Sequence, residues 1–322
     1  MQRIVILGST GSIGAQTLEV LRGSPQEFKV IGLSANHPSE AFEKQTAEFR
    51  PKHAIIASRE KDPAKALCAL ASIAEADAIV NALAGAAGCL PTLAACRAGK
   101  KIALANKESL VMAGEQIMAE AARTGAEIVP IDSELSALHQ ILQGADDEAI
   151  EKVIITASGG PFLGWTRERL QNATPQQALE HPNWSMGKKV TVDSATLMNK
   201  AFEMIEAHRL FGLPMEKIEV VIHRQSIAHA LVQWRDGNAQ AVMSPPDMCI
   251  AIAAALWHPR RPPASFSRLF PRLDFSKLHL DFAKPDFSLF PGPRLAAQVV
   301  KQGGIMPSVF AAADEQAVRQ FL

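Results

Sequence analysis

The chain opens with an apolar run and a glycine-rich turn, and this combination strongly limits the folds that it can adopt. Residues 3–7 (RIVIL) are typical of a buried strand, and Gly8, Gly11 and Gly14 separate them from an amphipathic segment, residues 15–25. A tight strand-to-helix turn lets backbone N–H groups at the helix start face a bound pyrophosphate. The spacing GxxGxxG differs from the GxGxxG fingerprint, so an ordinary β–α turn is the alternative. Its place at the first strand of an alternating pattern favours dinucleotide binding.

Strand-like and helix-like segments alternate as far as residue 132. Further strand-like segments are FKVIGLSA (28–35), HAIIAS (53–58), ADAIVNAL (76–83), KIALAN (101–106) and AEIVPID (126–132). Helix-like segments such as VMAGEQIMAEAARTG lie between them. Such alternation is typical of a parallel, doubly wound sheet. The sequence therefore predicts an α/β protein with a Rossmann-like dinucleotide-binding domain over residues 1–131.

The pattern changes in the rest of the chain. Longer, hairpin-like strands mix with helix-like stretches, which predicts a second, α+β domain over residues 132–257. Residues 258–293 are rich in proline and predict an extended linker. Residues 294–322 are helix-like and predict the start of a C-terminal helical domain.

Composition narrows the class of protein. Lysine plus arginine and aspartate plus glutamate both number 33, and this zero net charge gives no support for binding to nucleic acid or membranes. The four cysteines show no metal-binding spacing and are typical of reduced cytoplasmic thiols. A strand follows Met1 so closely that no signal or transit peptide is expected, and the longest apolar run, residues 248–257, is too short to span a bilayer. We therefore expect a cytoplasmic protein.

The strand-like run in EIVPIDSEL, residues 127–135, ends in two acids one residue apart, Asp132 and Glu134. In an extended chain, residues i and i+2 point to the same side, so these carboxylates would repel each other unless a cation lay between them. The alternative is a solvated strand end. A helix-like segment, residues 193–211, supplies a third acid, because Asn199 and Glu203 are four residues apart and share a face with Lys200.

Three carboxylates form an all-oxygen site suited to Mg²⁺ or Mn²⁺ and unsuited to zinc. The alternative for the helix is an ordinary solvated face. Ser194 occupies an N-cap-like position before this helix.

Two loops add polar groups. Ser158 in TASGGPF follows a strand and precedes two glycines, a pattern that presents hydroxyl and N–H donors to an anion. His181, Trp184 and Met186 lie in HPNWSMGKK, which is either a polar loop or a mobile lid. At the end of the second strand, residues 34–37 contain no acid to bind a ribose 2′-hydroxyl, which favours NADP over NAD, although the only basic residue there is a histidine.

These segments together resemble the 1-deoxy-D-xylulose-5-phosphate reductoisomerase family of the non-mevalonate isoprenoid pathway. The resemblance rests on GSTGSIG, AGAAGCLPTLAA, LANKESLVMAG, PIDSE, ASGGPF, HPNWSMG, VDSATLMNK and PPDM, in the family's order. It implies a cytoplasmic enzyme of bacterial type, a homodimer, that rearranges and reduces a small phosphorylated sugar. It also implies NADPH and a divalent cation, Mg²⁺ or Mn²⁺ with Co²⁺ as a further option, and a mobile flap on the catalytic domain.

The resemblance assigns roles to individual residues. The implied metal ligands are Asp132, Glu134 and Glu203, which with Lys107 near the reacting carbons form the catalytic set. The implied substrate contacts are Lys107, Ser133, Glu134, Ser158, His181, Ser194, Asn199, Lys200 and Glu203. The implied NADPH contacts are Thr10, Gly11, Ser12, Ile13, Asn36, Asn106, Glu108 and Gly187. Trp184 and Met186 are implied to lie on the flap, and His229 to support the site.

The chain departs from the family at several places. Asn36-His37-Pro38 replaces a common Gly-Lys-Asn, so the lysine expected to face the 2′-phosphate is absent. Arg224 stands where the family commonly has proline. Residues 58–65 join directly two segments that the family usually separates by another helix and strand. The chain also stops at Leu322, inside the expected C-terminal helical domain.

Two other functions fit part of the pattern. An NADP-dependent oxidoreductase of a phosphorylated sugar without an isomerase step would not need three oxygen ligands. A cofactor-binding regulator that has lost catalysis would be expected to have a broken set of acids, whereas this chain keeps all three.

Overall fold

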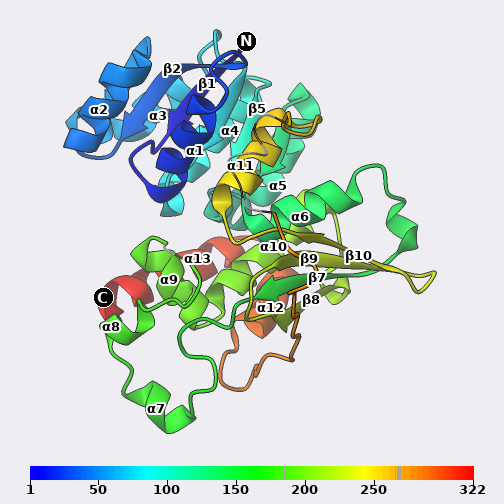
Figure 1. The fold of residues 1–322 in the computed structure, drawn as a ribbon. Coiled ribbons are helices and arrows are strands. Elements are labelled where there is room, and N and C mark those ends of the chain that lie inside the picture. The colour runs from blue at the N-terminus through cyan, green and yellow to red at the C-terminus, as the bar shows by residue number, and fades with distance from the viewer. Residues whose placement is uncertain (185, 265, 267–269, 271) are drawn as a thin grey trace. The chain divides into compact units, whose positions relative to one another are not determined.

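The structure, a computed structural model, describes residues 1–184, 186–264, 266, 270 and 272–322. The chain forms two compact units (Figure 1). The first comprises Met1–Asp132 and Met248–Phe270, and the second comprises Ser133–Asp247 and Pro271–Leu322. The domain boundaries predicted at residues 131, 257 and 293 separate regions by their expected function: cofactor binding, catalysis, linker and C-terminal helices. They stay a prediction. Residues 265, 267–269 and 271 of the predicted linker, and residue 185 of the predicted lid, lie outside the described residues.

The first unit is built on a six-stranded parallel sheet of strand order β3-β2-β1-β4-β5-β6. Its strands are β1 (Gln2–Leu7), β2 (Phe28–Ala35), β3 (His53–Ile56), β4 (Ala78–Asn81), β5 (Lys101–Leu104) and β6 (Glu127–Pro130). The central strand β1 is apolar and its last four residues are fully buried, as expected for a strand covered on both faces. This strand order is that of the doubly wound dinucleotide-binding fold.

Helices connect these strands. They are α1 (Ser12–Arg22), α2 (Glu40–Phe49), α3 (Pro63–Ala71), α4 (Cys89–Arg97) and α5 (Lys107–Thr124), with short 3₁₀ turns η1 (Ala57–Arg59) and η2 (Gly85–Gly88). The later helix α11 (Met248–Trp257) returns to this unit and packs beside α1 (Figure 1). Trp257 contacts Phe28 edge to face and donates a hydrogen bond to Glu27, which fixes the end of α11 on the core.

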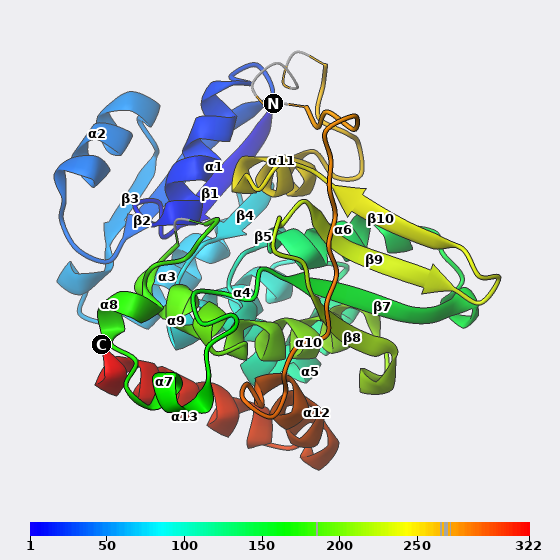
Figure 2. The same cartoon turned by 60° about the horizontal axis from the view of Figure 1, so that its bottom comes forward.

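The second unit contains a four-stranded mixed sheet of order β10-β9-β7-β8, visible side by side in Figure 2. Its strands are β7 (Ile150–Ala157), β8 (Ile218–Ile222), β9 (Ala228–Trp234) and β10 (Ala239–Met243). Its helices are α6 (Ser133–Leu142), α7 (Arg167–Gln171), α8 (Pro175–Ala178), α9 (Lys188–Ala195), α10 (Met198–Phe211), α12 (Gly292–Gln302) and α13 (Met306–Phe321), with 3₁₀ turns η3 (Asp147–Ala149) and η4 (Met215–Lys217). Inward apolar residues of β7, β8 and β9 form its core with α6, α9 and α10.

Two local predictions are wrong. Asp132 and Glu134 do not lie in an extended strand, because β6 ends at Pro130 and α6 begins at Ser133, so Glu134 lies in the first turn of a helix. Ser194 does not precede a helix, because it lies in the last turn of α9. The next helix, α10, begins only after Leu197, whose φ of +59° breaks the helical path.

Among the described residues, none of the helices combines the length and the apolar character that crossing a bilayer requires.

Candidate active site

The glycine-rich turn has two positions that only glycine fits. Gly8 has a φ of +80°, and a Cβ atom there would lie 2.7 Å from the carbonyl oxygen of Ala82. A Cβ atom on Gly14 would lie 2.2 Å from the carbonyl oxygen of Gly8. The close approach of α1 to β1 leaves residues 10–12 exposed and Ile13 half-buried at the helix N-terminus. Exposed N–H groups at such an N-terminus suit a pyrophosphate.

The end of β2 is tied to this turn. The backbone N–H groups of Gly8 and Ser9 donate to the carbonyl oxygen of Ser34 at 3.1 and 2.8 Å. The Ser9 hydroxyl also donates to the side-chain oxygen of Gln45, whose amide donates back to the Ser9 carbonyl oxygen, at 2.8 and 2.9 Å. Residues 36–37, which follow β2, are exposed and carry no acid. The turn therefore keeps a fixed relation to the place where the adenosine ribose of a dinucleotide is usually held.

Asn106 locks the start of α5. It is buried, its side-chain oxygen accepts from the backbone N–H of Ser109 at 3.1 Å, and its amide donates to the carbonyl oxygens of Leu83 and Gly85 at 2.9 Å each. The same amide lies 3.2 Å from a carboxylate oxygen of Glu108. The predicted cofactor contacts Asn106 and Glu108 therefore share one rigid turn with Lys107.

Three carboxylates form one cluster. One oxygen each from Asp132, Glu134 and Glu203 lies within 4.8 Å of the others. Asp132 is bonded directly to Ser133, so its place beside Glu134 follows from the chain itself. Glu203 is fully buried. Oxygens bound to Mg²⁺ lie about 2.0–2.1 Å from the ion, so adjacent ligands are roughly 3 Å apart and opposite ligands roughly 4 Å apart. A small adjustment of the side chains would bring these three carboxylates to that spacing, so the residues fit Mg²⁺ or Mn²⁺.

Two lysines partner these acids. Lys107 forms an ion pair with Asp132, and Lys200 forms ion pairs with Glu134 and, at 2.6 Å, with Glu203. Asn199 donates to the other oxygen of Glu203. Lys107 and Lys200 are themselves buried, so these ion pairs are strongly desolvated. Three acids against two lysines leave an excess of negative charge, which favours an added cation.

His181 joins two serines that are far apart in sequence. Its Nε2 atom lies 3.0 Å from the Ser158 hydroxyl and 3.1 Å from the Ser194 hydroxyl. Its Nδ1 atom accepts from the backbone N–H groups of Asn183 and Trp184 at 3.1 and 3.0 Å. Burial, together with the charge of Lys200, lowers the pKa of His181 to about 4. The imidazole is therefore neutral at pH 7 and carries its proton on Nε2.

The segment that follows His181 is attached to the β8–β9 turn. The Asn183 amide donates to the carbonyl oxygen of Arg224 at 2.5 Å and to the hydroxyl of Ser226 at 2.9 Å. Ser226 adopts a φ of +53°, which turns the chain sharply. The Trp184 ring lies 6.4 Å from the ring of His229, so this segment covers part of the sheet of the second unit.

His229 is buried on β9. Its Nε2 atom lies 2.8 Å from the hydroxyl of Ser244. Burial lowers its pKa, and the charge of Glu134 partly opposes that shift.

Three family models match the chain. The model of 1-deoxy-D-xylulose 5-phosphate reductoisomerase matches residues 4–67 and 62–114. A model of the C-terminal domain of this enzyme matches residues 128–211, and a model named DXP reductoisomerase C-terminal domain matches residues 243–322.

Curated relatives extend over the whole chain. A 1-deoxy-D-xylulose 5-phosphate reductoisomerase of Thermodesulfovibrio yellowstonii is 47% identical over 337 residues, covering 100% of this chain and 87% of the relative. This chain belongs to the 1-deoxy-D-xylulose 5-phosphate reductoisomerase family. A reductoisomerase of Geobacillus kaustophilus is 46% identical, covering 100% of this chain and 88% of the relative. The family predicted from the motifs is therefore confirmed.

Solved reductoisomerase structures agree with the fold. One in complex with NADPH, fosmidomycin and magnesium aligns with a TM-score of 0.91 at 37% identity, covering 100% of this chain and 85% of that chain. One from Zymomonas mobilis in complex with NADPH aligns with a TM-score of 0.90 at 37% identity, covering 100% of this chain and 86% of that chain. The predicted α/β fold class, with a Rossmann-like domain and a second α+β domain, is confirmed.

The residues predicted for the reductoisomerase site fall into local groups. The first unit holds Thr10, Gly11, Ser12 and Ile13 on one turn, Asn36 after β2, and Asn106, Lys107 and Glu108 on another turn. The second unit holds the cluster of Ser133, Glu134, Asn199, Lys200 and Glu203 and the cluster of Ser158, His181 and Ser194. Trp184 and Met186 are half-buried, and Gly187 is the exposed N-cap of α9.

Sequence reasoning missed Asn183 and Ser226. Asn183 lies inside the quoted HPNW motif, but only the structure reveals that its amide reaches the β8–β9 turn. The signal that could have pointed to the turn is the polar stretch HRQS between two apolar strands.

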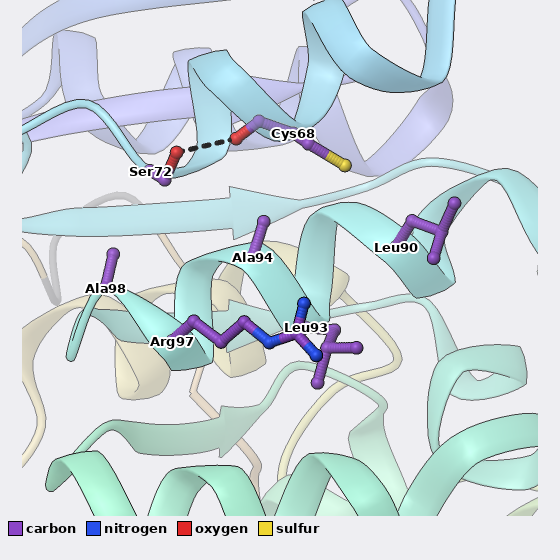
Figure 3. Close-up of a pocket in the computed structure, with 7 residues that line it drawn as sticks. All are labelled: Cys68, Ser72, Leu90, Leu93, Ala94, Arg97 and Ala98. Carbon is purple, nitrogen blue, oxygen red and sulfur yellow. Dashed lines mark hydrogen bonds between the residues drawn. The ribbon is translucent and has the colours of Figure 1, made fainter.

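A shallow pocket of about 430 Å³ lies between α3 and α4 of the first unit (Figure 3). Its lining residues are Cys68, Ser72, Leu90, Leu93, Ala94, Arg97 and Ala98. None of the residues predicted for cofactor, metal or substrate is among them. The pocket is therefore unrelated to the chemistry of the carboxylate cluster.

Proposed function

We propose that this chain converts 1-deoxy-D-xylulose 5-phosphate to 2-C-methyl-D-erythritol 4-phosphate, by a rearrangement and an NADPH-dependent reduction that requires a divalent cation. The observation that carries the proposal is the cluster of Asp132, Glu134 and Glu203 in a member of the reductoisomerase family. An oxidoreductase that only transfers a hydride does not need three carboxylates around one point. The reaction belongs to isoprenoid precursor biosynthesis.

The glycine-rich turn and the Asn106 turn would hold NADPH. The space that Cβ atoms on Gly8 and Gly14 would fill keeps the helix start close to the strand, and the exposed N–H groups suit the pyrophosphate. Asn106 and Glu108 present fixed polar groups from the same unit. Bound there, NADPH supplies the hydride for the reduction step.

Asp132, Glu134 and Glu203 would hold the cation. When bound, Mg²⁺ or Mn²⁺ supplies Lewis-acid polarisation of adjacent substrate oxygens. Lys200 and Asn199 bind Glu203 from two sides, so the carboxylate is oriented before any ligand arrives. Lys107 does the same for Asp132. This preorganisation lowers the cost of assembling a charged site.

Ser158, Ser194 and His181 would form part of the phosphate site. Both hydroxyl oxygens face the Nε2–H group of neutral His181, and the Ser158 oxygen also accepts from the backbone N–H of Gly160 at 3.2 Å. Since these oxygens accept, their own O–H groups can donate to phosphate oxygens. Asn199 and Lys200 add an amide and an ammonium group. Anchoring the phosphate provides remote binding energy that holds the reacting carbons in place.

The lid would exclude water. The Nδ1 atom of His181 binds two backbone N–H groups of the lid, so the residue that organises the serines also orders residues 183–184. Trp184 and Met186 would then cover a bound sugar phosphate. Exclusion of water protects the aldehyde that precedes reduction.

The direct test is to incubate the protein with 1-deoxy-D-xylulose 5-phosphate, NADPH and Mn²⁺ and to follow the loss of NADPH absorbance. We expect loss that stops after EDTA and resumes after excess Mn²⁺. Reduction that survives complete chelation would favour an oxidoreductase without an isomerase step. Binding of NADPH without any turnover would favour a cofactor-binding regulator.

We also propose that the protein acts in the cytoplasm, where NADPH is available, and as a homodimer. The homodimer rests on the family resemblance alone. Light scattering coupled to gel filtration tests it, and a mass of one chain would contradict it.

A further inference from the structure

The end of β2 poses a problem for NADPH recognition. In dinucleotide-binding folds, residues that follow the second strand face the adenosine ribose, and a nearby arginine accommodates the 2′-phosphate of NADP. Here this segment supplies only Asn36 and His37, whose side chains lie 3.1 Å apart. It contains neither lysine nor arginine.

A second segment emerges at the same edge of the sheet. β3 runs parallel to β2, with Ala35 opposite Ile56 at the ends of both strands. The 3₁₀ turn η1, residues Ala57–Arg59, follows β3 immediately. The backbone N–H of Ser58 donates to the carbonyl oxygen of Asn36 at 2.9 Å. The turn that ends in Arg59 is therefore bonded to the segment that carries Asn36 and His37.

The position of Arg59 is fixed on both sides. Before it, Ser58 is bonded to Asn36, and after it, the backbone N–H of Glu60 donates to the carbonyl oxygen of Ala57 at 3.1 Å. The connection is short, because α3 begins at Pro63 and Asp62 caps it through the backbone N–H of Lys65 at 3.0 Å. A short and capped connection keeps Arg59 beside the end of β2.

The positive charge of the Arg59 side chain is available to a ligand. Its side chain is exposed, and it forms no ion pair with any residue that the structure describes. Two other exposed arginines of the same unit are engaged, since Arg3 pairs with Asp77 and Arg22 pairs with Glu48, each at 2.6 Å. Neighbouring strands lie about 5 Å apart, so an arginine on the adjacent turn can reach a group held at the end of β2.

We propose that Arg59 is the residue that binds the 2′-phosphate of NADPH and so sets the preference of this chain for NADPH over NADH, an inference that rests on the proposed use of NADPH. A guanidinium group stays charged at all physiological pH values and binds phosphate through two parallel N–H groups. Asn36 and His37 add polar groups beside it. Arg59 thereby takes the place of the lysine that is absent after β2.

The test measures equilibrium binding of NADPH and NADH by fluorescence, without substrate or metal, for the wild type, Arg59→Ala, Arg59→Lys and Arg59→Glu. We expect Arg59→Ala to weaken NADPH binding roughly 10- to 100-fold, the range for a hydrogen bond to a charged group. NADH binding should stay within about twofold. Arg59→Lys should keep part of the affinity, and Arg59→Glu should bind NADH better than NADPH.

Lys29→Glu is the matched control. Lys29 is an exposed cation near the opposite end of β2, and its reversal changes the net charge by the same amount as Arg59→Glu. Six residues of strand place it about 20 Å from Ala35, beyond the screening length of about 8–10 Å at physiological salt. NADPH affinity should therefore change less than twofold in this variant.

Competition by adenosine 2′,5′-bisphosphate and by 5′-AMP tests whether Arg59 acts on the 2′-phosphate, because only the bisphosphate carries that group. Only the bisphosphate should compete less well with bound NADH in Arg59→Ala, because NADH itself carries no 2′-phosphate. Wild-type binding of NADPH that persists unchanged in Arg59→Ala and Arg59→Glu would overturn the inference and leave the proposed function intact. A wild type that binds neither NADPH nor NADH would contradict the proposed function and the inference together.

Discussion

Glu203 shows what the sequence could and could not predict at the scale of one residue. The combination of an acid, an amide and a lysine on one helical face indicated a polar site, and the structure places Asn199, Lys200 and Glu203 in contact. The expected reason for pairing Asp132 with Glu134 was wrong. They meet across a strand-to-helix junction, because α6 starts one residue after Asp132. The residue types therefore predicted a polar, metal-binding cluster. They did not predict the strand-to-helix junction that brings Asp132 and Glu134 together.

We predict that Glu203→Gln lowers kcat roughly a hundredfold or more, because it removes one anionic ligand from the cation site. NADPH affinity should stay within about twofold, since the glycine-rich turn is untouched. Glu206→Gln on the same helix is the matched control, because Glu206 is also fully buried but lies outside the carboxylate cluster. Equal loss of NADPH binding in Glu203→Gln would count against the assigned role.

His181 gives a prediction about acid stability. Its pKa falls from the usual 6.5 to about 4 in the folded protein, so the unfolded chain binds a proton more readily between these values. The folded state therefore loses stability as the pH falls from about 6.5 to about 4, and no further loss arises from this group at lower pH. In His181→Gln, the urea midpoint should fall less over this window than in the wild type. Parallel pH profiles of the two midpoints would contradict the shift.

At the scale of elements, strand and helix alternation predicted the parallel sheet because each segment was long and strongly patterned. The break between α9 and α10 could not be predicted, because residues 188–211 contain neither proline nor an internal glycine. The break occurs at Leu197, whose backbone lies against Gly292 at the start of α12. Tertiary packing therefore overrides the local helical preference there.

The lid provides the prediction for an element. Trp184→Ala should leave thermal unfolding almost unchanged, raise KM and lower kcat, with a loss on the order of tenfold in kcat/KM, because closure organises the site. Asn183→Ala should act in the same direction, since it removes the two hydrogen bonds to the β8–β9 turn. Unaltered kinetics in both variants would contradict a functional lid.

Limited proteolysis examines the same element without turnover. Cleavage between Pro161 and Lys189 should be rapid in the free protein and suppressed by NADPH, Mn²⁺ and a substrate analogue together, because local opening controls access. Equal protection in both states would exclude a lid that moves.

At the scale of the whole molecule, the order of long motifs was sufficient to predict the family, and the relatives confirm it. The sequence predicted that a βα unit of the family is absent near residues 58–65, and in the structure η1 lies between β3 and α3. The family model matches in two stretches that meet at residues 62–67, which is this same connection. The proposed role of Arg59 in binding the 2′-phosphate could not be predicted from the sequence, because it depends on the hydrogen bond from Ser58 to Asn36, which no residue pattern reveals.

Cation binding should stabilise the whole chain. A cation that binds only the folded state raises the free energy of unfolding by about 2.7 kcal/mol at a concentration a hundredfold above its Kd. Mn²⁺ should therefore raise the Tm, and EDTA should reverse the rise. Glu203→Gln should abolish most of this shift. An equal rise in the wild type and in Glu203→Gln would place the cation elsewhere.

The most direct test of the central claim follows one carbon–carbon bond. Conversion of 1-deoxy-D-xylulose 5-phosphate to 2-C-methyl-D-erythritol 4-phosphate breaks the bond between C3 and C4 and joins C4 to C2, whereas simple reduction keeps the chain unbranched. With substrate labelled with ¹³C at C3 and C4, NADPH and Mn²⁺, we predict a product in which the one-bond coupling between these two carbons is lost. A reduced product that keeps this coupling would contradict the proposed rearrangement.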